Sequence, residues 1–112
     1  LLYVSASTGL LEPSGFDFLG DWQSPHGAGS AEEVLMFNNA YLVYILKLAS
    51  EIAKILGDEG GASTYISAAQ RVRDATNARF FNASAGAYQA GGLPLQGLQV
   101  MALIAGLAPP LV

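Results

Sequence analysis

The residues best suited to chemistry gather in one short stretch of the chain, residues 16–27. This stretch contains the only tryptophan and the only histidine, Trp22 and His26, together with the acids Asp17 and Asp21. An aromatic ring can stack on the C–H face of a sugar, and a carboxylate beside it can accept hydrogen bonds from neighbouring hydroxyls. The stretch therefore predicts a carbohydrate site with Trp22, Asp21 and His26 as substrate-binding residues. On composition alone, a buried Trp22 that anchors a loop onto helices is an equally good interpretation.

Other kinds of chemistry find no support in the residues. The chain has no cysteine, which excludes thiol catalysis and disulfides. A single histidine among scattered acids gives no metal-ligand spacing, and neither a phosphate-binding glycine motif nor a nucleophile elbow is present. We therefore expect no metal and no cofactor. The net charge of −4 argues against nucleic acid as a partner, and no apolar run is long enough to predict a membrane span.

The composition predicts a folded piece of a larger structure. Hydrophobic residues make up 52 % of the 112 residues, which excludes a disordered chain. Charged residues make up only 12 %, against about 25 % in ordinary soluble domains. A small domain needs many polar residues to cover its large relative surface, so we expect this chain to have neighbours. The triplet Asn82-Ala83-Ser84 matches a glycosylation acceptor, which supports secretion only weakly and leaves the compartment unknown.

Apolar residues at helical spacing predict three helices, over residues 32–56, 63–80 and 94–107. Ser30 lies three residues before an acid, in a capping-box pattern, and Gly57 is placed to end the first helix in the left-handed conformation. The short connection between the first two helices favours antiparallel packing. The fold class is therefore all-α, built from helical hairpins.

The segments between these helices are expected to be loops. Residues 1–31 are rich in Gly, Ser and Pro, and a loop this long is usually functional, so we expect it to be the active-site loop region. The connection 58–62 is polar and rich in Gly, and 81–93 is rich in Ala, Gly and Asn. Each long loop precedes a helix, whereas the connection inside the hairpin is short.

The first helix carries two apolar stripes, so we expect it to need packing partners on two sides. The broader stripe consists of Phe37, Tyr41, Tyr44, Ile45, Leu48, Ile52, Ile55 and Leu56. The second consists of Leu35, Leu42, Leu46, Ala49 and Ala53.

These features resemble the catalytic domain of the α-L-rhamnosidases, a six-hairpin glycosidase family. The resemblance begins at Gly20-Asp21-Trp22-Gln23-Ser24-Pro25 and continues through the first helix to Gly57. It extends through Tyr65-Ile66-Ser67-Ala68-Ala69-Gln70-Arg71-Val72-Arg73 and Asn77-Ala78-Arg79-Phe80-Phe81 to Leu95-Gln96-Gly97-Leu98-Gln99 and the residues up to Pro109. It therefore covers roughly residues 15–109.

The resemblance implies that the chain is part of an (α/α)6 toroid whose active site lies in the cup formed by the loops before the inner helices. It implies hydrolysis of terminal α-L-rhamnose with inversion, by a general-acid and a general-base glutamate that we expect outside this chain. Trp22 and Asp21 match positions that line the sugar pocket in this family. Gln96 matches a frequent glutamine, but residues 90–94 and the flanking Leu95 depart from the family's pattern.

Two alternatives stay open at this point. The chain could belong to another helical-toroid glycosidase with a different substrate. It could instead be a helical-hairpin module that binds a protein partner through its apolar face. An unpaired apolar face could also drive self-association of the chain.

Overall fold

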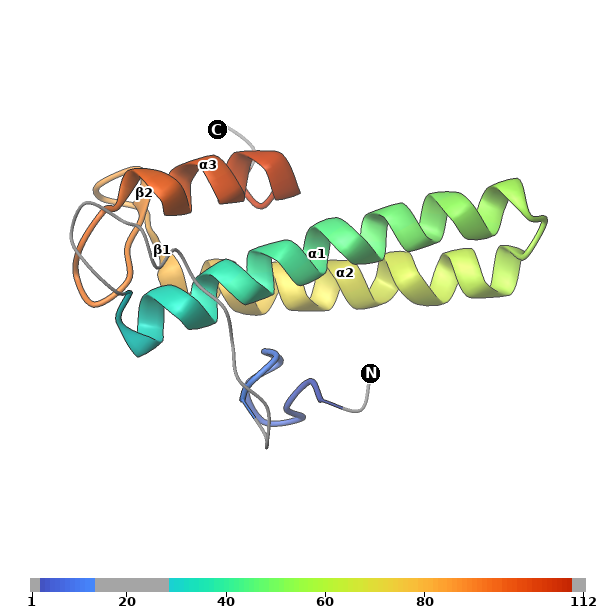
Figure 1. Cartoon of the computed structure of the whole chain (residues 1–112), viewed down its shortest axis with the longest axis horizontal. Coiled ribbons are helices and arrows are strands. Elements are labelled where there is room, and N and C mark those ends of the chain that lie inside the picture. The colour runs from blue at the N-terminus through green and yellow to red at the C-terminus, as the bar shows by residue number, and fades with distance from the viewer. Residues whose placement is uncertain (1–2, 14–28, 110–112) are drawn as a thin grey trace.

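Two long antiparallel helices form the body of the molecule (Figure 1). A computed structural model describes residues 3–13 and 29–109. Helix α1 (Ala31–Ile55) and helix α2 (Glu59–Phe80) make the hairpin, and the shorter helix α3 (Gln96–Ala105) lies against α1. Between α2 and α3 the chain forms a small antiparallel sheet of β1 (Phe81–Asn82) and β2 (Ala87–Tyr88). The prediction of an all-α fold built from helical hairpins is confirmed.

Both ends of α1 follow from local sequence. The Ser30 hydroxyl accepts a hydrogen bond from the Glu33 N–H at 3.2 Å, which satisfies one of the free amides of the first turn. The helix ends at Ile55, and Gly57 adopts a φ of +76°, the left-handed conformation expected for it. The helix begins and ends one residue earlier than the expected range of 32–56.

Helix α2 begins at Glu59, so the prediction that residues 58–62 form a loop was wrong. Asp58 caps the helix, because its carboxylate accepts a hydrogen bond from the Gly61 N–H at 2.8 Å. A side chain at Gly61 would collide with that carboxylate, so the glycine permits the cap instead of breaking the helix. The buried Ser50 hydroxyl also donates to the Ala62 carbonyl at 2.8 Å and joins this first turn to α1.

The segment 81–93 also differs from the expected loop, because its first half forms the β1–β2 hairpin. Strands of two residues are too short for alternating hydrophobicity to reveal them. Helix α3 is shorter than the expected 94–107: it begins at Gln96 and ends before Gly106, which adopts a φ of +66°. Pro94 therefore lies just before the helix rather than in its first turn.

The end of α3 is fixed by side chains from the α1–α2 hairpin. The Lys47 ammonium donates to the Ala105 carbonyl at 2.7 Å, and the Asn77 amide donates to the Leu107 carbonyl at 2.8 Å. Burial, with a smaller contribution from the nearby Arg73, lowers the pKa of Lys47. The first bond satisfies a carbonyl of the last turn that the helix itself leaves unpaired, and the second holds Leu107, which follows the end of α3.

The core lies where α1, α2 and α3 meet. Its largest fully buried apolar side chains are Leu10, Met36, Leu98, Leu107, Val43 and Val72. They come from all three helices and from the segments that flank them. Within the described ranges, no helix has the length and the hydropathy that crossing a bilayer requires.

The broader apolar stripe of α1 is largely exposed, whereas most of the narrower stripe is buried. Along α1, the exposed fraction reaches 57 % at Ile52 and 83 % at Ile55, while Leu46 and Ala53 are buried. Helix α3 is similar, because 71 % of Leu103 is exposed. One side of α1 therefore packs within the hairpin, and the other has no partner among the described residues.

Candidate functional site

The predicted substrate-binding residues Asp21, Trp22 and His26 lie outside the described residues. The structure describes the chain up to Pro13 and again from Gly29. The segments on either side of the gap are both attached to α1, through Asn39 at Leu11 and through the helix cap at Ser30. We therefore describe these two attachments and the surfaces beside them.

On the N-terminal side, Asn39 holds the chain at Leu11. The Asn39 amide oxygen accepts from the Leu11 N–H at 2.7 Å, and its amide nitrogen donates to the Leu11 carbonyl at 2.9 Å. The same nitrogen donates to the Leu35 carbonyl at 2.9 Å. The Asn39 side chain is completely buried. It therefore pairs with the backbone of Leu11 as a neighbouring strand would, and attaches residues 3–13 to the helix.

Four parts of the fold meet at one end of the molecule (Figure 1). They are the start of α1, the end of α2, the β1–β2 hairpin and the start of α3. The connection from α2 to α3 lies at this end, and the short turn of the α1–α2 hairpin lies at the other (Figure 1). Functional residues concentrate on loops that a rigid framework positions, so this end is the candidate functional site.

A buried tyrosine and two amides fix the β1–β2 hairpin to the helices. Gln99 donates to the Tyr88 carbonyl at 2.6 Å and accepts from the Tyr88 N–H at 2.8 Å. The Tyr88 hydroxyl donates to the Asn77 amide oxygen at 2.6 Å, and its ring packs on Phe81. Burial raises the pKa of Tyr88 to about 12, so its hydroxyl keeps its proton at neutral pH.

A polar hollow of about 470 Å³ opens beside this hairpin. Glu32 and Arg79 line it as an ion pair, in which the guanidinium contacts both carboxylate oxygens, at 2.5 and 3.2 Å. Asn82 at the end of β1 and Gln89 directly after β2 also line it. The Asn82 amide nitrogen donates to the Gln89 amide oxygen at 3.1 Å. The hollow is therefore lined by a charged pair and by amide side chains.

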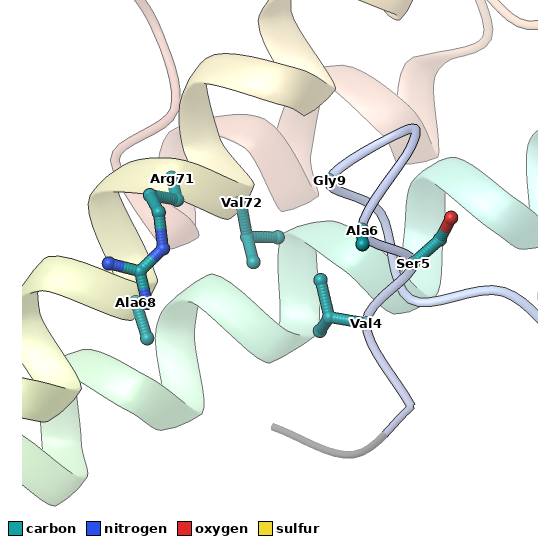
Figure 2. Close-up of a pocket in the computed structure, with 7 residues that line it drawn as sticks. All are labelled: Val4, Ser5, Ala6, Gly9, Ala68, Arg71 and Val72. Atoms are coloured by element: carbon teal, nitrogen blue, oxygen red, sulfur yellow. The ribbon is translucent and has the colours of Figure 1, made fainter.

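A second hollow, of about 290 Å³, lies between residues 3–13 and α2 (Figure 2). Its wall is mostly small and apolar, with Val4 and Ala6 facing Ala68 and Val72, and Arg71 lies at its edge. It is away from the candidate site and offers little polar chemistry.

No site was predicted from the residues of the first hollow, and Asn82 was named only as part of a glycosylation acceptor. Glu32 lies in the first turn of α1, where the helix dipole favours an acid, and its partner Arg79 is 47 positions away. Gln96, which the resemblance singled out, is exposed at the first position of α3, whereas Gln99 makes the contacts described above. Among the described residues, no three acids, cysteines or histidines lie close enough together to hold a metal ion.

Comparison with known proteins assigns the chain to a family. Residues 4–111 match the model of the bacterial alpha-L-rhamnosidase 6 hairpin glycosidase domain. No curated protein and no solved structure matches the chain significantly. The match spans nearly the whole chain and agrees with its helical hairpin. The chain therefore belongs to the bacterial alpha-L-rhamnosidase six-hairpin glycosidase family, whose members are glycoside hydrolases of the rhamnosidase type.

Proposed function

We propose that this chain is part of a glycoside hydrolase that removes terminal α-L-rhamnose with inversion of configuration. The observation that carries the proposal is the family match over residues 4–111. Inverting hydrolysis needs a general acid and a general base on opposite faces of the sugar. The resemblance to the α-L-rhamnosidases puts both of these glutamates outside this chain, so the chain contributes binding rather than proton transfer.

Within this function, Trp22 stacks on the rhamnose ring and Asp21 accepts hydrogen bonds from its hydroxyls. His26, in the same stretch, is the third substrate-binding residue. The anchors at Leu11 and Ser30 support this assignment, because they attach both flanks of the stretch to α1. A binding loop must be held by a rigid framework if it is to orient a sugar.

The exposed apolar faces of α1 and α3 also agree with the proposal. The described residues contain one complete helical hairpin and the first helix of the next. A six-hairpin domain supplies further helices to cover these faces. In the absence of such partners, we propose that the chain self-associates through them, and sedimentation of the chain on its own tests this.

The experiment that tests the function is a rhamnose titration monitored by tryptophan fluorescence. Trp22 is the only tryptophan, so the signal reports on one position. We expect saturable quenching by L-rhamnose and none by D-glucose, with a weaker response in Asp21→Asn. In the protein that contains the chain and both glutamates, Trp22→Ala should lower kcat/KM for an α-L-rhamnoside at least about 30-fold, since losing a large aromatic contact costs about 2 kcal/mol. An unchanged kcat/KM would contradict the proposed role of Trp22.

A further inference from the structure

The second hollow, between the segment 3–13 and α2, combines an apolar wall with one basic side chain (Figure 2). Arg71 lines it, and among the described residues that line it none is acidic. The apolar part of the wall is built from small side chains of both elements: Val4, Ala6, Ala68 and Val72. The hollow therefore suits a ligand that is partly apolar and partly negatively charged.

Arg71 carries a charge that the described residues leave unpaired. Within residues 3–13 and 29–109, its exposed guanidinium makes no hydrogen bond and no ion pair. Of the five basic side chains, the other four each bind a carbonyl or a carboxylate: Lys47, Lys54, Arg73 and Arg79. A guanidinium presents its N–H groups in a planar fork that matches the two oxygens of a carboxylate. Arg71 is therefore available to pair with the carboxylate of a ligand.

The apolar wall offers an aliphatic group a place away from water. Ala68 and Val72 form the α2 side of the hollow, and both are buried. Val4 and Ala6 line it from the opposite side (Figure 2). An alkyl group that enters between these two sides exchanges contact with water for contact with apolar side chains, which is favourable. An anion without an alkyl group, such as acetate, would leave this surface uncovered.

The volume of the hollow limits the size of this ligand. It measures about 290 Å³, close to the lower end of the roughly 300–1,000 Å³ that small-molecule sites span. This is the space that roughly ten water molecules fill in the liquid, at about 30 Å³ each. A branched acid of about six carbon atoms therefore fits the hollow, whereas a long-chain fatty acid would extend beyond it.

The hollow is formed before any ligand arrives, because the segment 3–13 is held in place. The Ser5 N–H donates to the Leu10 carbonyl at 2.8 Å, and the Gly9 N–H donates to the Ser5 carbonyl at 2.8 Å. Gly9 adopts a φ of +72°, and a Cβ there would lie 3.1 Å from the Ala75 Cβ, so the glycine lets the segment approach α2 closely. A site with ordered walls loses less conformational entropy on binding.

We propose that this hollow binds a small branched aliphatic carboxylate, whose alkyl group packs against Val4 and Val72 and whose carboxylate pairs with Arg71. The site is separate from the proposed sugar chemistry and goes beyond it. A ligand held there would contact both the segment 3–13 and α2. Because it binds the folded arrangement of the two, it should stabilise the segment against local opening.

The test is a titration of the full chain with 4-methylpentanoate, its uncharged amide and acetate, observed through the NMR signals of the ligand. We expect 4-methylpentanoate to bind at least about fivefold more tightly than the amide, which lacks the negative charge, and than acetate, which lacks the alkyl group. Saturation transfer from the protein should be strongest at the methyl protons of the ligand, because these lie against the two valines. Amide hydrogen exchange in residues 3–13 should slow in the presence of 4-methylpentanoate.

Matched variants locate the two halves of the ligand. Arg71→Gln should lower the affinity for 4-methylpentanoate at least about fivefold and leave that for the amide unchanged. Lys54→Gln removes an exposed cation outside the hollow and should change neither affinity. Ala6→Leu fills the hollow from its exposed edge, so it should weaken the binding of both ligands at least about threefold. Ala78→Leu adds the same side chain at an exposed position of α2 outside the hollow and should weaken neither.

Three results would overturn the proposal. The first is equal binding of 4-methylpentanoate and its amide, because the charge of Arg71 would then play no part. The second is full binding of 4-methylpentanoate to Ala6→Leu, because the alkyl group would then lie outside the hollow. The third is binding of N-acetyl-leucine at least about tenfold more tightly than 4-methylpentanoate, which would assign the hollow to the carboxyl end of a peptide instead.

Discussion

Asn39→Ala should lower the free energy of unfolding by about 3 kcal/mol. The Asn39 side chain is completely buried and makes three hydrogen bonds, two with Leu11 and one with Leu35. A hydrogen bond in a folded protein contributes about 1 kcal/mol net, so the loss of three gives this figure. Leu11 is half-buried, so water can reach its freed backbone groups only in part.

The assay is urea denaturation followed by circular dichroism, together with amide hydrogen exchange. Exchange should accelerate most in residues 3–13, because Asn39 attaches them to α1, and least near the α1–α2 turn. Gln70→Ala is the control, since it removes an exposed amide with one hydrogen bond within its own helix, and it should cost less than about 0.5 kcal/mol. A loss below 1 kcal/mol in Asn39→Ala, or exchange that rises equally everywhere, would refute the reasoning.

Asn39→Asp extends this test through its pH dependence. The new carboxyl would face two backbone carbonyls in a buried site, so its pKa in the folded state should rise above the usual value of about 3.9. Stability should then be greatest below pH 4 and fall as the pH rises through the folded-state pKa. A variant whose stability relative to the wild type does not change with pH would contradict the buried geometry of Asn39.

Three further predictions concern the framework of the site. Burial raises the pKa of Tyr88 to about 12, so the free energy of unfolding should fall as the pH rises from about 10 towards 12. The midpoint of urea denaturation measures this fall, which should be less steep in Tyr88→Phe. In thermal unfolding, Gly106→Ala should cost about 2 kcal/mol and Gly57→Ala about 1 kcal/mol. Both glycines have positive φ, but a Cβ at Gly106 would lie 2.7 Å from the Lys47 ammonium, whereas one at Gly57 meets open space. Equal losses would exclude the close contact at Gly106. Glu32→Gln should cost less than about 1 kcal/mol, and the difference from wild type should vanish in 1 M salt, because its ion pair is exposed.

Local signals were enough to predict most of the helical framework. Ser30 and Gly57 set the limits of α1, and the spacing of apolar residues identified all three helices. The start of α2 was missed because a glycine pair ordinarily breaks a helix, whereas here Gly61 leaves room for the Asp58 carboxylate that caps it. Which stripe of α1 would be buried also could not be predicted, since both are apolar and only tertiary packing selects one.

The candidate site was predictable only in part. The stretch with Asp21, Trp22 and His26 stood out by composition, and it stays a prediction. The hollow had no such signal, because the pair of Glu32 and Arg79 joins residues 47 positions apart, and this proximity arises only when α1 and α2 pack antiparallel. A rare residue such as the single tryptophan can be recognised in the sequence. Common residues such as Glu32 and Arg79 form a surface hollow only when folding brings them together.

The anchoring of Leu11 by Asn39 and of Tyr88 by Gln99 has a consequence for how such a domain can diversify. In each case one amide side chain on a helix makes hydrogen bonds to the backbone N–H and carbonyl of a single residue. These bonds do not involve that residue's side chain. Asn39 thereby holds the chain at Leu11, and Ser30 holds it again where α1 begins. Because both attachments use backbone or helix-capping groups, the sequence between Leu11 and Ser30 can vary while the helices keep their packing.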